Sequence, residues 1–410
     1  MGLAVGYMGT KRHLAPSVAE VVRTCRPGPV LDSFSGMCAV GEAIGESRSV
    51  WHNDVQRFSF EVAQAFFGAQ TPPPLTGFVA THLYEDFEAN KAALTTRFDV
   101  ELNDENISID DGSVEAMLNR MSAARHVGND TNYETERDIL SKSKNNFPYR
   151  LCSITFSDGY FGLKQSIEID SIRYCIDKAI IRKSINHETH RWLLIALCQA
   201  ALRVASTTGH FAQFIKPNLN NLSVFLRQRK RSVWETWLNC IAELNPIGGT
   251  LWRRTNKAFN QDSLSLLEIL KESKTRPAVI YADPPYTDDQ YSRYYHIWET
   301  LVIYDYPKTS GHGRYRPDRF NTPFSKKTTV KKAMDDFIGK CRALKSDLVL
   351  SYPENGLLCK TGENIIKILK HHYDKVEISH CLDYNHSTMG ASKGVATQAV
   401  KELIYLARTH

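Results

Sequence analysis

Long hydrophobic runs are missing from this 410-residue sequence, although 42% of its residues are hydrophobic. No stretch approaches the roughly 18 uninterrupted apolar residues of a membrane-spanning helix, so we expect no membrane span. The first residues lack the basic-then-apolar order of a secretory signal peptide. Gly6 stands where a myristoylation signal has Ser or Thr, which argues against a lipid anchor.

Paired cysteine patterns are also missing. The nine cysteines include no C-x-x-C pair and no Cys/His spacing typical of a zinc site. Scattered cysteines of this kind are typical of reduced, mostly buried thiols in a cytosolic protein. We therefore expect a cytoplasmic protein without a metal.

The net charge of the chain is only +6, but basic side chains are scarce in one stretch and acidic side chains are scarce in another. Residues 81–140 carry 14 acidic and 5 basic side chains, whereas residues 201–260 carry 9 basic and 2 acidic ones. This asymmetry suggests one surface that meets a polyanion and another that does not. Two ordinary solvated faces would have the same composition.

Short apolar runs alternate with helical patterns near both ends of the chain. Residues 30–32 predict a buried strand, with a small-residue loop and a helix start near Ala39 after it. A second strand ends at Asn53 and Asp54 and leads into an amphipathic helix. Further strands are expected at 278–282, 347–351 and about 402–407. Such alternation is typical of an α/β fold with a parallel sheet.

The middle of the chain is different. From about Thr81 the sequence becomes polar, acidic and rich in Asn and Asp, and its stretches "NDENISIDDG" (103–112) and "GNDTNYETERD" (128–138) predict loops or a mobile segment. Helical periodicity returns at 165–181 and continues through two further segments until "NPIGG" at 245–249 breaks it. We therefore expect an α/β domain formed by residues 1–85 and 249–410, interrupted by a mainly helical insertion at 86–248.

The loop after the first strand has the composition of a ligand-binding turn. Asp32 ends the strand, and Phe34, Ser35 and Gly36 allow backbone amides to approach a ligand at the carboxyl end of the sheet. Asp54, about twenty residues later, is placed to accept hydrogen bonds from ribose hydroxyls. The loop lacks a full G-x-G-x-x-G, so an adenosine-bearing cofactor is favoured over a dinucleotide. An ordinary tight strand–helix turn would look the same.

Three motifs resemble one known family. "ADPPY" (282–286) after a hydrophobic strand resembles the catalytic motif of methyltransferases that modify exocyclic amines of bases. "DSFSGMCAVG" is similar to their cofactor loop, with Cys38 where the family usually has its second glycine. "YMGTKRHLAPSV" resembles the lysine-bearing amino-terminal motif of Dam-type adenine methyltransferases.

The resemblance covers about residues 5–70 and 250–410, in the order of the α class, with the target-recognition domain inserted before the catalytic motif. It implies a Rossmann-like methyltransferase sheet, S-adenosylmethionine as cofactor and double-stranded DNA as partner. A restriction or defence-system protein is a further possible partner, and the acidic segment is a candidate docking surface for it.

The catalytic motif can be read chemically. The lone pair of an adenine N6 amine is delocalised into the ring, so the amine is a poor nucleophile. A carboxylate from Asp283 and the carbonyl of Pro284 would accept its two hydrogens, and the prolines, including Pro285, hold these acceptors rigidly. The Tyr286 ring would stack on the base after it leaves the duplex.

Position within the motifs implies further contacts. The cofactor would meet Tyr7, Lys11, Asp32, Phe34, Ser35, Gly36, Asp54, Asp262 and Asp283, although Asp262 also suits a helix N-cap. DNA would meet the cluster Arg227, Arg229, Lys230 and Arg231, the pair Arg253 and Arg254, and Gln290, Tyr291 and Arg293 of the loop after the motif.

The motifs leave alternatives open. The same chemistry on cytosine N4 or on RNA adenine would use an identical D-P-P-Y turn. The long insertion favours duplex DNA, because reading a sequence requires an element that enters a groove. A silent DNA-binding scaffold that kept the fold is another class, but the complete catalytic motif argues against it. The expected function is site-specific DNA adenine-N6 methylation within a restriction–modification or phage-defence system.

Overall fold

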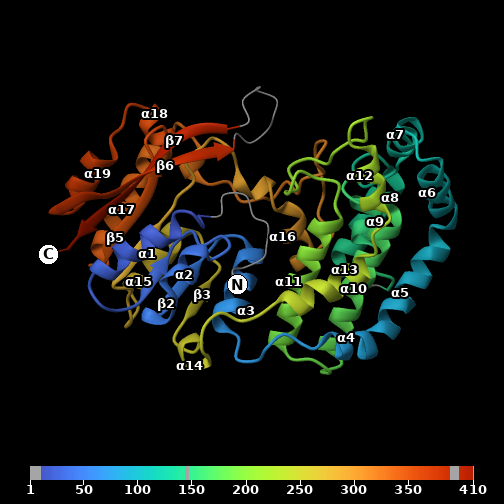
Figure 1. The fold of residues 1–410 in the computed structure, drawn as a ribbon, viewed down its shortest axis with the longest axis horizontal. Coiled ribbons are helices and arrows are strands. Elements are labelled where there is room, and N and C mark those ends of the chain that lie inside the picture. The colour runs from blue at the N-terminus through green and yellow to red at the C-terminus, as the bar shows by residue number, and fades with distance from the viewer. Residues whose placement is uncertain (1–10, 144–146, 388–396, 410) are drawn as a thin grey trace.

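A seven-stranded mixed sheet forms one side of the molecule, and a group of helices forms the other (Figure 1). This arrangement is seen in a computed structural model that describes residues 11–143, 147–387 and 397–409. The strand order is β3-β2-β1-β4-β5-β7-β6, and the first five of these strands run parallel. The strands are β1 (Val30–Asp32), β2 (Val50–Asn53), β3 (Lys257–Phe259), β4 (Val279–Ala282), β5 (Asp347–Pro353), β6 (Lys375–Ser387) and β7 (Thr397–Arg408).

The predicted α/β fold is confirmed, and so are the strands expected near 30, 50, 280, 350 and 405. The sequence did not indicate β3 or β6. β3 has only three residues, and β6 has few consecutive apolar side chains because it is the outer strand of an antiparallel pair with β7. Strands at the edges of a sheet need less apolar surface than central ones.

Helices cover both faces of the sheet, because successive strand residues point to opposite sides. Leu31, Ile280 and Leu348 belong to the core beneath α15 (Ser263–Lys271), α17 (Val330–Ala343) and α19 (Ile365–His372). Their neighbours Val30 and Val279 face the other core, with α1 (Ala15–Thr24), α2 (Ala39–Ile44) and α3 (Arg57–Gly68). A parallel sheet buried on both faces has its ligand-accessible positions at the strand ends.

The predicted helical stretch contains no named strand among the described residues from 76 to 253. Most residues of the two central helices are buried, including Ile169–Ile176 of α10 and Leu193–Cys198 of α11. The helices are α4 (Thr76–His82), α5 (Tyr84–Arg97), α6 (Asp99–Asp111), α7 (Val114–Ala123), α8 (Thr131–Lys142), α9 (Leu151–Thr155), α10 (Leu163–Ile181), α11 (His187–Val204), α12 (Leu222–Arg229), α13 (Val233–Glu243) and α14 (Thr250–Arg253). Whether residues 86–248 act as a separate recognition domain stays a prediction.

The acidic stretch is helical, so the expectation of loops there is wrong. Its Asp, Gly and Ser residues mark the ends of helices. Gly112 closes α6 in the left-handed conformation, Ser113 caps α7, and Asp130 accepts hydrogen bonds from Asn132 N and Tyr133 N at the start of α8. Side chains that cap helices and side chains that favour loops are the same residue types, so composition alone does not separate them.

One continuous hydrophobic core joins the helices to the sheet. Phe58 of α3 packs against Trp298 of α16 (His296–Ile303), with ring centroids 4.4 Å apart, and Phe66 packs against Trp192 at 5.1 Å. All nine cysteines are free, and seven of them are buried, as the sequence indicated. In the described part of the chain no helix is long and apolar enough to cross a membrane.

Candidate active site

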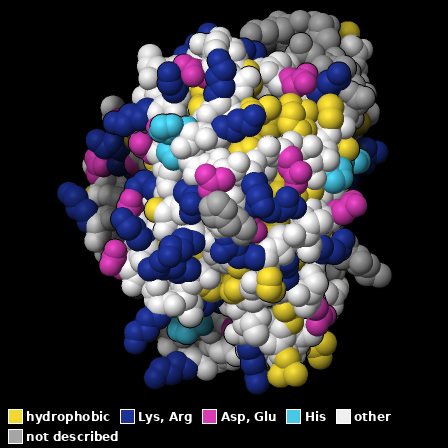
Figure 2. Space-filling view, turned by 90° about the vertical axis from the view of Figure 1, so that its left-hand side faces the viewer, with side chains coloured by type: hydrophobic (Ala, Val, Ile, Leu, Met, Phe, Trp, Pro, Cys, Tyr) yellow, Lys and Arg dark blue, Asp and Glu magenta, His cyan; other side chains and the backbone are white. Residues whose placement is uncertain are grey.

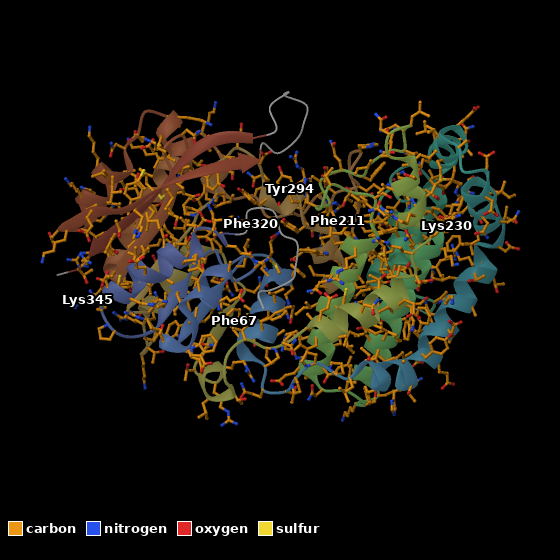
Figure 3. All side chains as sticks on the ribbon, viewed as in Figure 1. Phe67, Phe211, Lys230, Tyr294, Phe320 and Lys345 are labelled. Carbon is orange, nitrogen blue, oxygen red and sulfur yellow. The ribbon has the colours of Figure 1, made fainter. Side chains whose placement is uncertain are left out.

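A cavity opens at the carboxyl ends of β1, β2 and β4, where open α/β sheets bind ligands. Phe320, one of its lining residues, lies between the sheet and the helical part (Figure 3). Most of the predicted cofactor and catalytic residues line this cavity: Lys11, Asp32, Phe34, Ser35, Gly36, Asp54, Asp262, Asp283, Pro284, Pro285 and Tyr286. Tyr7 lies outside the described residues.

The loop after β1 is held by its neighbouring strands. Ser33 N donates to Tyr281 O at 3.0 Å, and Ser35 N donates to Asn53 O at 2.9 Å. Gly36 has φ of 47° and Cys38 has φ of 60°, both in the left-handed region. Glycine favours this region, which explains why the resembled family has one at the position of Cys38. The small thiol is tolerated there, fully buried in front of α2.

Asp54 ties the β1 loop to β2. Its Oδ2 accepts from Gly36 N and its Oδ1 from Gln56 N, both at 2.9 Å. Burial raises the pKa of Asp54 to about 6, although these two hydrogen bonds oppose the shift. Each carboxylate oxygen has a second lone pair, so Asp54 can still accept from a ligand in the cavity.

Asp32 and Asp262 also line the cavity. Burial raises the pKa of Asp32 well above its usual range, the nearby Asp283 adds to the shift, and Oδ1 of Asp32 has no hydrogen-bond partner. Asp262 caps α15 by accepting from Leu264 N at 3.1 Å and Ser265 N at 3.2 Å. The two readings of Asp262 are therefore compatible, because it is an N-cap that also lines the cavity.

The D-P-P-Y segment follows β4 directly and lies opposite the β1 loop. The Lys11 ammonium lies 3.2 Å from Oδ1 of Asp283 and 2.5 Å from Oε1 of Glu402. Burial raises the pKa of Asp283 to about 7, against the opposing effect of Lys11. Burial lowers the pKa of Lys11, but the two carboxylates outweigh it and keep the ammonium charged.

Tyr286 completes the wall. Its carbonyl accepts from Leu357 N at 2.8 Å, which anchors the end of the turn to the segment after β5. The ring is largely buried, and its centroid lies 4.8 Å from the Lys11 ammonium. A carboxylate, the rigid proline pair and an aromatic face thus surround one space.

The loop after the turn also reaches the cavity. Gln290 and Tyr291 line it, and Oε1 of Gln290 accepts from Thr322 N at 3.0 Å. Arg293 lies outside the lining, half-buried, with its guanidinium 3.2 Å from Oδ1 of Asp289. His296 is buried and its Nε2 lies 3.1 Å from the Phe211 carbonyl, which is a packing role.

The two basic clusters are split by burial. Arg229 is buried and donates to Gly159 O at 2.8 Å, and Arg253 is buried and donates to Ala69 O at 2.7 Å. Their burial contradicts the prediction that they contact phosphates. Arginines can satisfy inward-facing carbonyls with several donors, and a run of basic letters does not reveal which member turns inward. Arg227, Lys230, Arg231 and Arg254 are exposed.

The catalytic turn lies in a segment that is similar to a known family. Residues 250–346, which include β4 and the D-P-P-Y turn, match the family D12 class N6 adenine-specific DNA methyltransferase. This part of the chain is therefore similar to the D12 class.

Three curated proteins are similar to longer parts of the chain. Type II methyltransferase M.FokI of Planomicrobium okeanokoites is 28% identical over 52% of this chain and 29% of its own length. Modification methylase StsI of Streptococcus sanguinis is 22% identical over 89% of this chain and 46% of its own length. Modification methylase LlaI of Lactococcus lactis subsp. lactis is 22% identical over 80% and 43%. The chain thus spans less than half the length of these relatives.

Sequence reasoning missed several residues of the candidate site. Gln261, Phe320 and Thr322 line the cavity, and buried Glu402 holds Lys11 from behind. Only Glu402 had a signal in the sequence, because it is an acid inside the apolar run of the last strand. In the described part of the chain no group of three or more His, Cys, Asp or Glu is placed to hold a metal ion.

Proposed function

We propose that this protein is an S-adenosylmethionine-dependent DNA methyltransferase that modifies the N6 amine of adenine. One observation carries the proposal: the D-P-P-Y turn and the β1 loop, more than 240 residues apart in the sequence, line the same cavity. A cofactor lying on the β1 loop and a base held by the turn would then meet directly. Proximity of this kind lowers the barrier to transfer without a covalent enzyme intermediate.

The residues present fit the proposed cofactor. Asp32 is a buried carboxylate at the cavity, Asp54 and Asp283 are partly buried there, and desolvation raises the pKa of each. Among the described lining residues, Lys11 is the one Lys or Arg, and its ammonium also pairs with Glu402, which does not line the cavity. A cationic ligand would stabilise the charged forms of these carboxyls, so the site favours one. When bound, S-adenosylmethionine supplies the methyl group from a positively charged sulfonium.

Individual residues divide the work. Asp54 is placed for ribose hydroxyls and Asp262 for the adenine end of the cofactor, with Phe34, Ser35 and Gly36 along the methionine end. Asp283 accepts one hydrogen of the target amine and the Pro284 carbonyl accepts the other. These hydrogen bonds draw the nitrogen lone pair out of conjugation with the ring. Asp283 must be ionised for this, so activity should rise with pH through the pKa of its carboxyl group.

Duplex DNA is the proposed substrate. A target amine inside the double helix cannot reach Asp283, so the base must leave the stack, and the Tyr286 ring offers a face to receive it. The exposed members of the basic clusters, Arg227, Lys230, Arg231 and Arg254, are proposed to meet phosphates on either side. The relatives named as modification methylases favour a role in a restriction–modification system, with a restriction or defence protein as a possible partner and the cytoplasm as location.

The test is direct. Purified protein would be incubated with methyl-labelled S-adenosylmethionine and either duplex DNA, single-stranded DNA or RNA of matched sequence, and the nucleosides would be identified by mass spectrometry. We expect N6-methyladenine from duplex DNA, with sequencing of the product giving its context. N4-methylcytosine, or label confined to RNA, would replace the proposal with one of the alternatives that the same motif allows.

A further inference from the structure

The Lys11 ammonium sits inside a triangle of three groups. It lies 2.5 Å from Oε1 of Glu402, 3.2 Å from Oδ1 of Asp283 and 4.8 Å from the centroid of the Tyr286 ring. Glu402 is the nearest of the three and forms a hydrogen bond with it. Oδ1 of Asp283 is within ion-pair distance of Lys11 but has no well-oriented hydrogen bond with any described group.

Glu402 reaches this place because of the antiparallel strand β7. It pairs with Pro353, the last residue of β5, so its side chain comes to the carboxyl edge of the sheet beside the end of β4. Glu402 is only 3% exposed and does not line the cavity. Its carboxylate therefore faces Lys11 from the protein side, and Asp283 faces Lys11 from the cavity side.

The position of the ammonium conflicts with binding of the target base. The amine has to donate a hydrogen to Asp283 while the base stacks on Tyr286, and Lys11 is already close to both. A cation that pairs firmly with Asp283 would occupy the acceptor that the amine needs. Lys11 therefore requires another anionic partner while the base is bound.

We propose that Glu402 is a positioning residue that retains the Lys11 ammonium and so leaves the Asp283 carboxylate to the target amine. This inference rests on the proposed function. Two carboxylates and one ammonium leave one negative charge: with Lys11 neutralised by Glu402, that charge stays on Asp283. Without the Glu402 charge, Asp283 becomes the only anion within reach of Lys11 among these three groups.

Other ionisable groups also face Asp283. They are Asp32 at the end of β1, Tyr281 on β4, and Tyr291 after the turn, in addition to Lys11 and Glu402. Burial raises the pKa of Tyr281 and of Tyr291, so both stay neutral. Glu402 is thus the carboxylate that binds Lys11 most closely. Removing its charge leaves Asp283 as the remaining carboxylate paired with Lys11.

The decisive variant is Glu402→Gln, which keeps size and shape. Removing a negative charge makes Asp283 easier to ionise, so its pKa should fall by roughly one unit or more. This is measured without substrate by NMR titration of protein carrying carbon-13 in the aspartate carboxyls, with Asp283→Asn to assign the signal. The low-pH limb of the methylation rate should move to lower pH as well.

The maximal rate should nevertheless fall, because Lys11 now competes for Asp283. We expect a loss of at least about tenfold in kcat, with smaller losses in Glu402→Asp, which keeps the charge. A carboxylate that ionises more easily and yet works more slowly is the signature of competition. A slower enzyme with an unmoved Asp283 pKa would show that Glu402 only supports the fold, and an unchanged kcat would overturn the proposal too.

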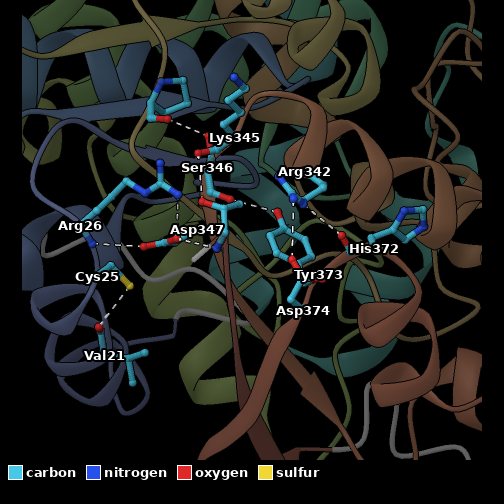
Figure 4. Close-up of polar contacts among 12 residues, drawn as sticks. Val21, Cys25, Arg26, Arg342, Lys345, Ser346, Asp347, His372, Tyr373 and Asp374 are labelled. Carbon is cyan, nitrogen blue, oxygen red and sulfur yellow. Dashed lines mark hydrogen bonds and ion pairs between the residues drawn. The ribbon is translucent and has the colours of Figure 1, made fainter.

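Asp347→Asn is the matched control. Asp347 is another buried carboxylate, and it forms an ion pair with Arg26 at 3.2 Å (Figure 4). It is the first residue of β5, so it lies at the amino ends of the parallel strands, away from the cavity at their carboxyl ends. The substitution Asp347→Asn should lower the free energy of unfolding without shifting the pKa of Asp283. If Glu402→Gln does not fold, Lys11→Met provides the opposite test, because loss of the cation should raise the pKa of Asp283.

These outcomes separate the two proposals. A wild-type protein that methylates no adenine contradicts the proposed function, whatever the titration shows. An active wild type whose Asp283 titrates identically with and without the Glu402 charge contradicts only the positioning role.

Discussion

At the scale of single residues, the main feature is the Asp283 carboxyl group, because its surroundings disfavour the charged form. Asp283 is partly buried near Asp32 and Glu402, and the nearby Lys11 ammonium is bound more closely by Glu402 than by Asp283. A site with this balance is suited to bind one more positive or hydrogen-donating group. Both the proposed sulfonium cofactor and the proposed amine substrate meet that description.

Asp283→Ala should remove methyl transfer while the protein still folds and binds cofactor. The lost hydrogen bond acts on the amine in the transition state, so the effect should appear in kcat rather than in KM. A decrease of at least about 100-fold is expected, comparable with the loss of one preorganised hydrogen bond in other enzymes. Single-turnover rates together with calorimetric titration of S-adenosylmethionine would measure both quantities, and near-normal turnover would remove Asp283 from the mechanism.

Tyr286 should act through its ring face. Tyr286→Phe should retain much of the activity, whereas Tyr286→Ala should lose most of it, because the base is no longer held beside Asp283. Extruding a base costs a few kcal/mol, so a duplex with a mismatch opposite the target adenine should bind more tightly than a matched one. Fluorescence of 2-aminopurine at the target position reports unstacking. Equal binding of the two duplexes without a fluorescence rise would argue for a single-stranded or RNA substrate.

At the scale of secondary-structure elements, buried acids connect helices that are distant in the sequence. Glu105 of α6 accepts from Leu163 N at 2.7 Å and from Lys164 N at 2.9 Å, and so caps the central helix α10. Burial raises the pKa of Glu105, and the neighbouring Arg229 opposes the shift. At least one acid of this stretch, Glu105, therefore stabilises the packing of the helices and does not face solvent.

Glu105→Ala should destabilise the helical part. It leaves two N–H groups at the start of α10 and the buried Arg229 without their carboxylate, which should cost about 1–3 kcal/mol of unfolding free energy. Asp104→Ala is the control, because Asp104 is the exposed neighbour on the same helix and should change stability by less than about 0.5 kcal/mol. Denaturant unfolding followed by circular dichroism measures both. Equal effects of the two changes would show that the cap contributes nothing specific.

At the scale of the whole molecule, positive charge is spread over more than one face. Lys230 and Lys345 lie toward opposite ends (Figure 3), and the face at the sheet end also carries many Lys and Arg side chains among Asp and Glu (Figure 2). Net charge alone therefore does not locate a DNA-binding surface. The cavity lies between the two ends, so bound DNA would have to extend from it toward the helical part to reach Lys230.

Neutralising Arg227, Lys230 and Arg231 together should weaken DNA binding and flatten its salt dependence. Each lost phosphate contact should reduce the slope of log affinity against log salt by about 0.9. Neutralising the exposed Lys367 and Lys370 of α19, at the sheet end, is the charge control and should leave the slope unchanged. Fluorescence anisotropy titrations at several salt concentrations would measure this. Identical slopes for both variants would leave the 227–231 cluster as a solvated face.

The sequence by itself determined the α/β class, the central strands and the turn that carries Asp283, because short buried strands and a D-P-P-Y turn are local patterns. It also predicted about half of the cavity lining, since residues that directly follow parallel strands meet at one end of the sheet. What only the tertiary structure decided depends on distant contacts: the helical state of the acidic stretch, whose capping residues look like loop residues, and the inward turn of Arg229 and Arg253. The contact of Glu402 with Lys11 belongs to the same group, because strand pairing brings together two charges that are 391 positions apart in the sequence.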